Sequence, residues 1–144
     1  MPLTLQLMKL TTQQAQAAIV GATEKAASIK VPMNIAVLDA GGHLKSFVRM
    51  DSAVLGSIDI ALKKAKTAVL FGMASEQVRE FSKPGAASQW LEATNGVLVT
   101  FAGGIPFKNA DGEIVGAIGV SGGSVDQDRS IAAAGAAAAT VNLT

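Results

Sequence analysis

The chain contains no cysteine and a single histidine, His43, and this scarcity limits how its fold can be stabilised. Disulfide bonds and thiol chemistry are excluded, and so are structural zinc sites, which need four ligands of the Cys and His type. The fold must therefore rest on apolar burial. Hydrophobic residues make up 49% of the chain but only 4% of it is aromatic, so we expect a core of small aliphatic side chains.

Length and charge narrow the class of protein further. The 144 residues fit one domain, and we assign residues 1–144 to a single domain. A net charge of +1 offers no electrostatic footprint for nucleic acid. No apolar stretch approaches the roughly 18 residues of a membrane span, and Met1–Leu5 lacks the pattern of a signal peptide. We therefore expect a cytoplasmic protein with no membrane partner.

Hydrophobic periodicity and capping residues predict the secondary structure. Thr11 with Gln14, and Ser124 with Gln127, form capping-box patterns at the starts of two helices, and Ser57 is a candidate cap for a third. The predicted helices cover residues 11–30, 57–70, 75–81 and 124–139, with a further helical turn at 89–92. The predicted strands cover residues 33–38, 43–50, 97–101, 105–108 and 113–121. Because hairpin turns join most of them, the sheet should be mainly antiparallel, with helices packed on it.

The second predicted strand carries the most suggestive side chains. A two-residue period places His43, Lys45, Phe47 and Arg49 on one face of this strand. An aromatic ring flanked by cations suits a flat apolar ligand with carboxylates, such as haem, for which histidine can supply an axial nitrogen. The alternative is a solvated strand face with one incidental phenylalanine, and the residues alone favour that alternative.

Two lysines follow on the next predicted helix. Lys63 lies four residues after Asp59, which indicates a surface ion pair on a solvated helix face. The functional alternative is an anion-binding wall, formed by Lys63 and Lys66, that faces Arg49. The sequence alone leaves this choice open.

The segment Gly119–Gly123 matches the G-x-S-x-G pattern of a nucleophile elbow. His43 lies upstream of Ser121, whereas that fold places its histidine downstream. We therefore interpret the segment as a strand-to-helix turn, in which backbone N–H groups near Gly122 and Gly123 can bind an anion. The alanine-rich run at 132–139 is explained by helix propensity alone, or by close packing within the chain or between subunits.

Several segments, taken together and in this order, resemble the GlcG/HbpS-like family and the C-terminal domain of PduO-type proteins. They are VLDAGGHL at 37–44, RMD at 49–51, AxxKAxTA at 61–68, GGIP at 103–106 and VGAIGVSGG at 115–123, followed by Asp126 to Asp128. The match covers nearly the whole chain. It implies an α/β (α+β) sandwich, broadly profilin-like, with a central antiparallel sheet of about five strands flanked by helices on both faces.

The resemblance also implies homo-oligomers, often octamers built from dimers, and a link to haem. Without tyrosine or cysteine, the usual axial ligands narrow to His43 and methionines such as Met50. Our first hypothesis is therefore a cytoplasmic oligomeric protein that binds haem or a related tetrapyrrole through His43, supported by Lys45 and Arg49.

Two further hypotheses remain. One is a small enzyme or accessory protein acting on a carboxylated metabolite, as implied by family members from glycolate or diol catabolic operons. Its site would combine Asp39, Arg49 and Lys66 with the Gly122–Gly123 turn, in which Arg and backbone donors hold the carboxylate. The other is a structural or partner-binding module without a ligand.

Overall fold

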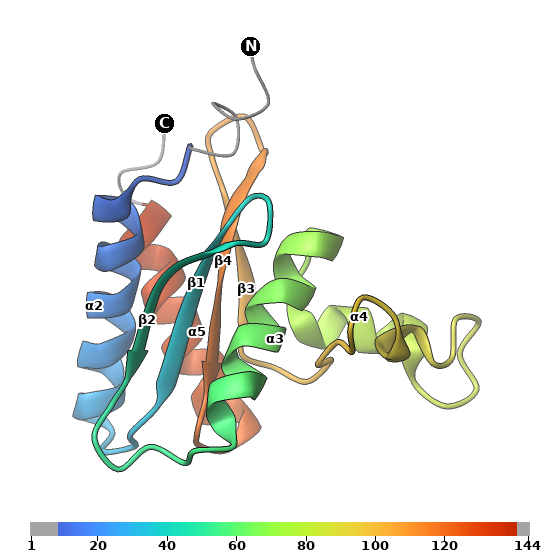
Figure 1. Cartoon of the computed structure of the whole chain (residues 1–144), viewed down its shortest axis with the longest axis horizontal. Coiled ribbons are helices and arrows are strands. Elements are labelled where there is room, and N and C mark those ends of the chain that lie inside the picture. The colour runs from blue at the N-terminus through green and yellow to red at the C-terminus, as the bar shows by residue number, and fades with distance from the viewer. Residues whose placement is uncertain (1–8, 141–144) are drawn as a thin grey trace.

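Within residues 9–140, the part of the chain that the computed structural model describes, four strands form one antiparallel sheet in the order β2-β1-β4-β3 (Figure 1). The strands are β1 (Asn34–Asp39), β2 (Leu44–Arg49), β3 (Gly104–Lys108) and β4 (Ile114–Ser121). The predicted antiparallel sheet built from hairpins is confirmed. The expectation drawn from Met1–Leu5 concerns residues outside the described range.

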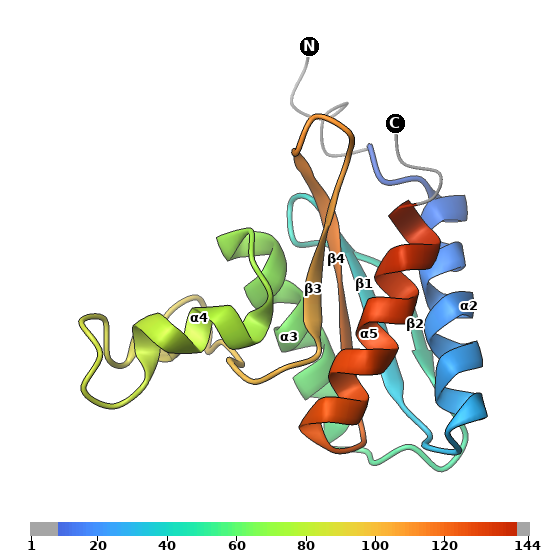
Figure 2. The same ribbon diagram turned by 180° about the vertical axis from the view of Figure 1, so that it is seen from behind.

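Helices cover both faces of this sheet. The helices α2 (Thr12–Ser28) and α5 (Val125–Thr140) lie side by side on one face, and α3 (Ser57–Phe71) lies on the other. Helix α4 (Ser75–Ser82) and the short 3-10 helix η1 (Leu91–Ala93) form an arm that projects from the body (Figure 2). No helix within residues 9–140 is long and apolar enough to cross a bilayer.

The expected sheet of about five strands is corrected to four, because the segment predicted at 97–101 is irregular. The N–H of Val97 donates to the carbonyl of Thr94 at 3.0 Å, and the N–H of Val99 donates to the Thr67 hydroxyl at 3.2 Å. Val97 also has a φ of 76°, in the left-handed region. The N–H groups of Val97 and Val99 are therefore satisfied by a turn and by α3, and the run does not pair as a strand.

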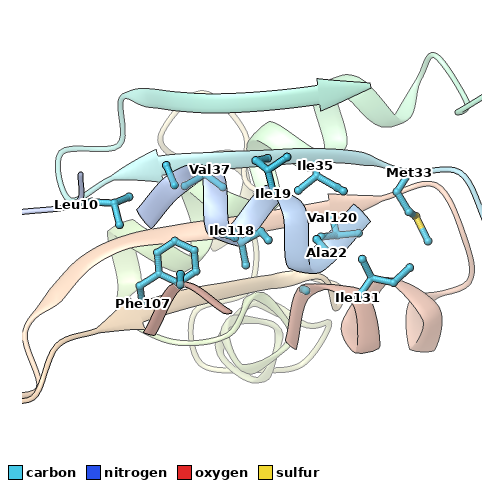
Figure 3. Close-up of a cluster of buried hydrophobic side chains, with 14 of the residues drawn as sticks. Leu10, Ile19, Ala22, Met33, Ile35, Val37, Phe107, Ile118, Val120 and Ile131 are labelled. Atoms are coloured by element: carbon cyan, nitrogen blue, oxygen red, sulfur yellow. The ribbon is translucent and has the colours of Figure 1, made fainter. Parts of the chain in front are cut away.

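Alternation along β1 divides the interior into two apolar clusters. Ile35 and Val37 face α2 and α5, where Ile118, Val120 and the buried ring of Phe107 join them (Figure 3). Ala36 and Leu38 face α3 and pack against its alanines. Because β1 is buried on both faces, its four central residues are all apolar.

The predicted capping boxes are confirmed at two helices. The N–H of Gln14 donates to the Thr11 hydroxyl at 3.0 Å, and the N–H of Gln127 donates to the Ser124 hydroxyl at 3.2 Å. The prediction that Ser57 caps α3 is wrong. Ser57 is the first residue of the helix, and its N–H is satisfied by the carbonyl of Val54 at 3.1 Å instead.

Small residues let the helices approach one another and the sheet closely. A Cβ at Gly135 would lie 2.9 Å from the carbonyl oxygen of Ala18, and one at Gly21 would lie 2.7 Å from the Ala138 Cβ. The alanine-rich run of α5 thus serves packing against α2 within the chain. Across the sheet, Gly119 makes room for α3 at Ala61 and Ala65.

Replacing Gly119 by alanine should lower the free energy of unfolding by about 3 kcal/mol, because the new methyl group meets the rigid backbone of α3. Gly56→Ala is the matched control, since nothing lies within 4 Å of a Cβ there. Urea denaturation of both variants tests this. Equal stability of the two would contradict the close approach of α3 to β4.

Candidate functional site

The turn between β1 and β2 is organised by Asp39. Its Oδ1 accepts hydrogen bonds from the N–H groups of Gly41 at 2.9 Å and His43 at 3.0 Å, and its own N–H donates to the His43 carbonyl at 2.9 Å. The Asp39 carboxylate therefore shapes the turn. The imidazole of His43 is exposed and makes no hydrogen bond or ion pair within residues 9–140.

The predicted alternation along β2 is interrupted by a bulge. Val37 pairs with Ser46 and Leu38 pairs with Leu44, so Lys45 is an extra residue without a partner on β1. Phe47 lies opposite Ala36 and packs against the α3-side cluster. Its ring therefore belongs to the margin of the apolar core and is not a free surface on which a flat ligand could stack.

The strand register places six of the eight predicted ligand-binding residues at two opposite ends of the sheet. Asp39, His43 and Lys45 lie at the β1–β2 turn. Arg49 lies at the opposite end, where Asn34 pairs with both Arg49 and Ser121, and Gly122 and Gly123 follow β4 there. The six residues of β1 separate the two groups by about 20 Å. The structure thus does not bring Asp39 together with Arg49 and the Gly122–Gly123 turn.

The two surface lysines of α3 have partners within the chain. Lys63 forms the predicted i,i+4 ion pair with Asp59 at 2.9 Å. The ammonium of Lys66 donates to the carbonyl of Asn95 at 2.6 Å and so holds the turn after η1 against α3. Neither lysine has its charge free to form a wall facing Arg49.

The turn after β4 also uses its donors internally. The N–H of Gly123 donates to Asp128 Oδ1 at 3.0 Å, and that of Ser124 donates to Gln127 Oε1 at 2.9 Å. Ser121 is 4% exposed and lies at the end of the sheet opposite His43. A nucleophile elbow at Ser121 has no histidine base beside it.

A buried ion pair that the sequence analysis missed lies beside this turn. Lys64 of α3 is fully buried, and its ammonium donates to Asp128 Oδ2 of α5 at 2.8 Å and to the Val120 carbonyl at 2.9 Å. The Phe101 ring centroid lies 4.9 Å from the same nitrogen. The ammonium thus has two hydrogen-bond acceptors and one aromatic ring as partners, and these join elements on both faces of the sheet.

The surrounding backbone is shaped around Lys64. A Cβ at Gly103 would lie 2.8 Å from the Lys64 ammonium, and one at Gly104 would overlap with the Lys64 carbonyl. The Ser75 hydroxyl accepts from the Gly104 N–H at 2.9 Å and donates to the Phe101 carbonyl at 2.7 Å. A signal was present in the sequence, since Lys64 falls within the buried stripe of Ala61, Ala65 and Ala68 on α3.

Burial dominates the electrostatics of this pair. Desolvation lowers the pKa of Lys64, although the hydrogen bond and charge of Asp128 act in the opposite direction. Desolvation likewise raises the pKa of Asp128, against the effect of Lys64 and of the Gly123 N–H. The pair is inaccessible to a ligand, and its role is to position α3, β4 and α5. Within the described residues no group of three or more His, Asp or Glu side chains is arranged to hold a metal ion.

Comparison with known proteins places this fold in a family. A family model described as "Haem degrading protein HbpS-like" matches residues 10–137. The chain belongs to the HbpS-like family. An uncharacterised 15.0 kDa protein from the dhaT-dhaS intergenic region of Citrobacter freundii is 38% identical over 88% of this HbpS-like chain and 89% of its own length.

Two further relatives connect the family to corrinoid and haem proteins. The corrinoid adenosyltransferase PduO of Salmonella typhimurium is 40% identical over 83% of the chain, and the match spans only 36% of that longer protein. The crystal structure of a PduOC–haem complex has a TM-score of 0.84 and 38% identity, covering 90% of this chain and 94% of that one. The resemblance to the GlcG/HbpS-like family inferred from the sequence motifs is confirmed.

In this HbpS-like protein, replacing Lys64 by methionine leaves the Asp128 carboxylate buried without its cation. We expect the free energy of unfolding to fall by about 3–5 kcal/mol. The double variant Lys64→Met/Asp128→Leu removes both charges and should recover most of that loss.

Urea denaturation measures these changes, with Asp59→Ala as the control for an exposed pair, which should change stability by less than about 1 kcal/mol. A double variant no more stable than Lys64→Met would show that attraction within the pair outweighs its desolvation.

Proposed function

We propose that this protein is a cytoplasmic homo-oligomer that binds haem or a related tetrapyrrole. The observation that carries the proposal is the PduOC–haem complex, which shares 38% identity and a TM-score of 0.84 over 90% of this chain. The family description also refers to haem. At this level of similarity the fold that holds haem in that complex is present here, so the question becomes which side chains hold it.

His43 is the side chain best suited to bind the iron. The chain has no cysteine or tyrosine, and His43 is its sole histidine. Its imidazole is exposed and makes no contact with a partner in the described chain. Met50, the alternative ligand, is less available, because its sulfur accepts the N–H of Met33 at 3.4 Å and its side chain packs against the α2-side cluster.

Lys45 is the cation placed to pair with a propionate of that haem. It lies two residues from His43, at the bulge of β2. Arg49 lies six residues from His43, or about 20 Å along the strand, at the opposite end of the sheet. Haem bound at His43 would therefore use Lys45, and Arg49 belongs to a different part of the surface.

The exposure of the β1–β2 turn around His43, which we call the rim, supports an oligomer. His43 is exposed and its neighbour Leu44 is 58% exposed, so one protomer covers little of a macrocycle held there. A tetrapyrrole has a large apolar surface that is unfavourable in water. A second copy of the chain, packed against the same rim, would cover the remaining surface. We accordingly propose dimers, which assemble into octamers as the family resemblance implies.

Titration of the purified protein with hemin, followed by absorbance, tests the proposal. The expected result is a saturable Soret band at a defined stoichiometry that is lost in His43→Ala. Lys45→Met should weaken binding by about tenfold, the loss of one charge-assisted contact. Lys108→Met, an exposed lysine in the β3–β4 hairpin, is the matched control and should bind like the parent protein.

A titration without saturation would contradict haem binding itself. Equal saturation of the parent protein and His43→Ala would contradict only the assignment of His43. Size-exclusion chromatography with light scattering, with and without hemin, tests the oligomer, and a monomer in both states would contradict that part of the proposal.

A further inference from the structure

Three polar side chains are buried where the first turn of α3 meets the sheet. Asn34 of β1 is fully buried, Ser121 of β4 is 4% exposed, and Ser57 at the start of α3 is 7% exposed. Elsewhere on this face, β1 and β4 present Ala36, Leu38 and Ala117 to the helix. A polar group of this kind within an apolar layer needs partners or a function.

The strand register brings these residues side by side. Asn34 lies directly opposite Ser121 on one neighbouring strand and directly opposite Arg49 on the other, so the three share the α3 face of the sheet. The Val54 carbonyl links them to the helix, since it accepts from Asn34 Nδ2 at 2.9 Å and from the Ser57 N–H at 3.1 Å. We call Arg49, Asn34, Ser121 and Ser57 the polar row.

Most of the hydrogen-bonding capacity of the polar row is unused. Asn34 Oδ1 is buried and has no partner among the described residues. The bond from Asn34 Nδ2 to Val54 is the only side-chain hydrogen bond that the row makes within residues 9–140. The guanidinium of Arg49 is exposed and has no carboxylate partner there. The row therefore combines a buried acceptor that lacks a donor, two hydroxyl groups and a free cation.

We infer that the polar row is a binding site for a short carboxylate that also carries a hydroxyl group. The ligand hydroxyl would donate to Asn34 Oδ1, and its carboxylate would accept from Arg49 and from a serine hydroxyl. The row itself contains no carboxylate, so a neutral hydroxyl fits beside Asn34 better than an ammonium group. The ligand is short because the Val54 carbonyl, which accepts from Asn34 Nδ2, closes the row.

The segment from Met50 to Gly56 covers this site. Val54 and Leu55 are 60% and 67% exposed, so the cover has one layer of chain and its large apolar side chains point outward. The hydrogen bond from Asn34 Nδ2 to the Val54 carbonyl holds this segment against the polar row. A ligand that reaches Asn34 must replace this bond, and it then supplies the donor that Asn34 Oδ1 lacks. This site lies at the end of the sheet opposite His43 and is independent of haem binding.

NMR titration with lactate tests the inference on the full-length protein. Saturable shifts are expected at the side-chain amide of Asn34 and at the backbone amides of Ser57 and Ser121. Propionate lacks only the hydroxyl, and in isopropanol a methyl group replaces the carboxylate, so each should bind about tenfold more weakly or worse. Absence of saturable shifts at Asn34, as expected if only a buried water completes the row, would overturn the inference.

Arg49→Met separates specific binding from a general salt effect. Arg49 is exposed, so its replacement leaves the core intact, and lactate affinity should fall by about tenfold. Lys45→Met, on the same strand at the other end, should leave lactate affinity unchanged. Equal affinity of Arg49→Met and the parent protein, or equal affinity for lactate and propionate, would overturn the inference. Hemin binding by Arg49→Met should remain normal, so the two sites can fail separately.

Discussion

The buried ion pair between Lys64 and Asp128 is the interaction on which the packing of helices on both faces of this sheet depends. The Lys64 side chain extends from α3, and its ammonium donates to the Val120 carbonyl near the end of β4 and to Asp128 of α5, which lies on the other face. Taking both charges out of water is costly, and neutral replacements of similar size often serve stability equally well. The pair instead fixes position. Its partners are directional, so α3 and α5 can occupy only one relation to β4, and the close approach at Gly103 and Gly104 follows from that relation.

Antiparallel pairing then decides where the candidate ligand-binding residues lie. The strands β1 and β2 are antiparallel and joined by a tight turn. The first residues of β2 therefore lie at that turn, and its last residues lie at the opposite end of the sheet. His43 and Lys45 lie at the turn, where Asp39 has already used its carboxylate to hold the backbone. Arg49 lies at the other end beside Asn34. A single strand face that looks like one site in the sequence therefore provides two different chemical environments.

Much of this fold could be predicted because local patterns carry it. The capping boxes at Thr11 and Ser124 and the apolar runs of β1 and β4 depend only on near neighbours. The failures involve partners distant in sequence. In the apolar run at 97–101, the N–H of Val99 donates to the Thr67 hydroxyl and not to a neighbouring strand. Lys64 pairs with Asp128, which lies 64 residues later in the chain. The bulge at Lys45 and the orphan oxygen of Asn34 likewise arise only once the strands are in register.

The same distinction explains which polar residues remain available for function. Polar groups that fold the chain have used their hydrogen-bonding capacity: Asp39 in a turn, Lys66 on Asn95, and Lys64 on three partners. Among the described residues, the His43 imidazole makes no hydrogen bond or ion pair, and Asn34 Oδ1 is one of three buried side-chain atoms without a partner, with Thr23 Oγ1 and Glu92 Oε2. An imidazole exposed without a partner costs little, because water solvates it. An amide oxygen buried without a partner is costly, and a ligand bound at the polar row would supply the donor that no residue within 9–140 gives to Asn34 Oδ1.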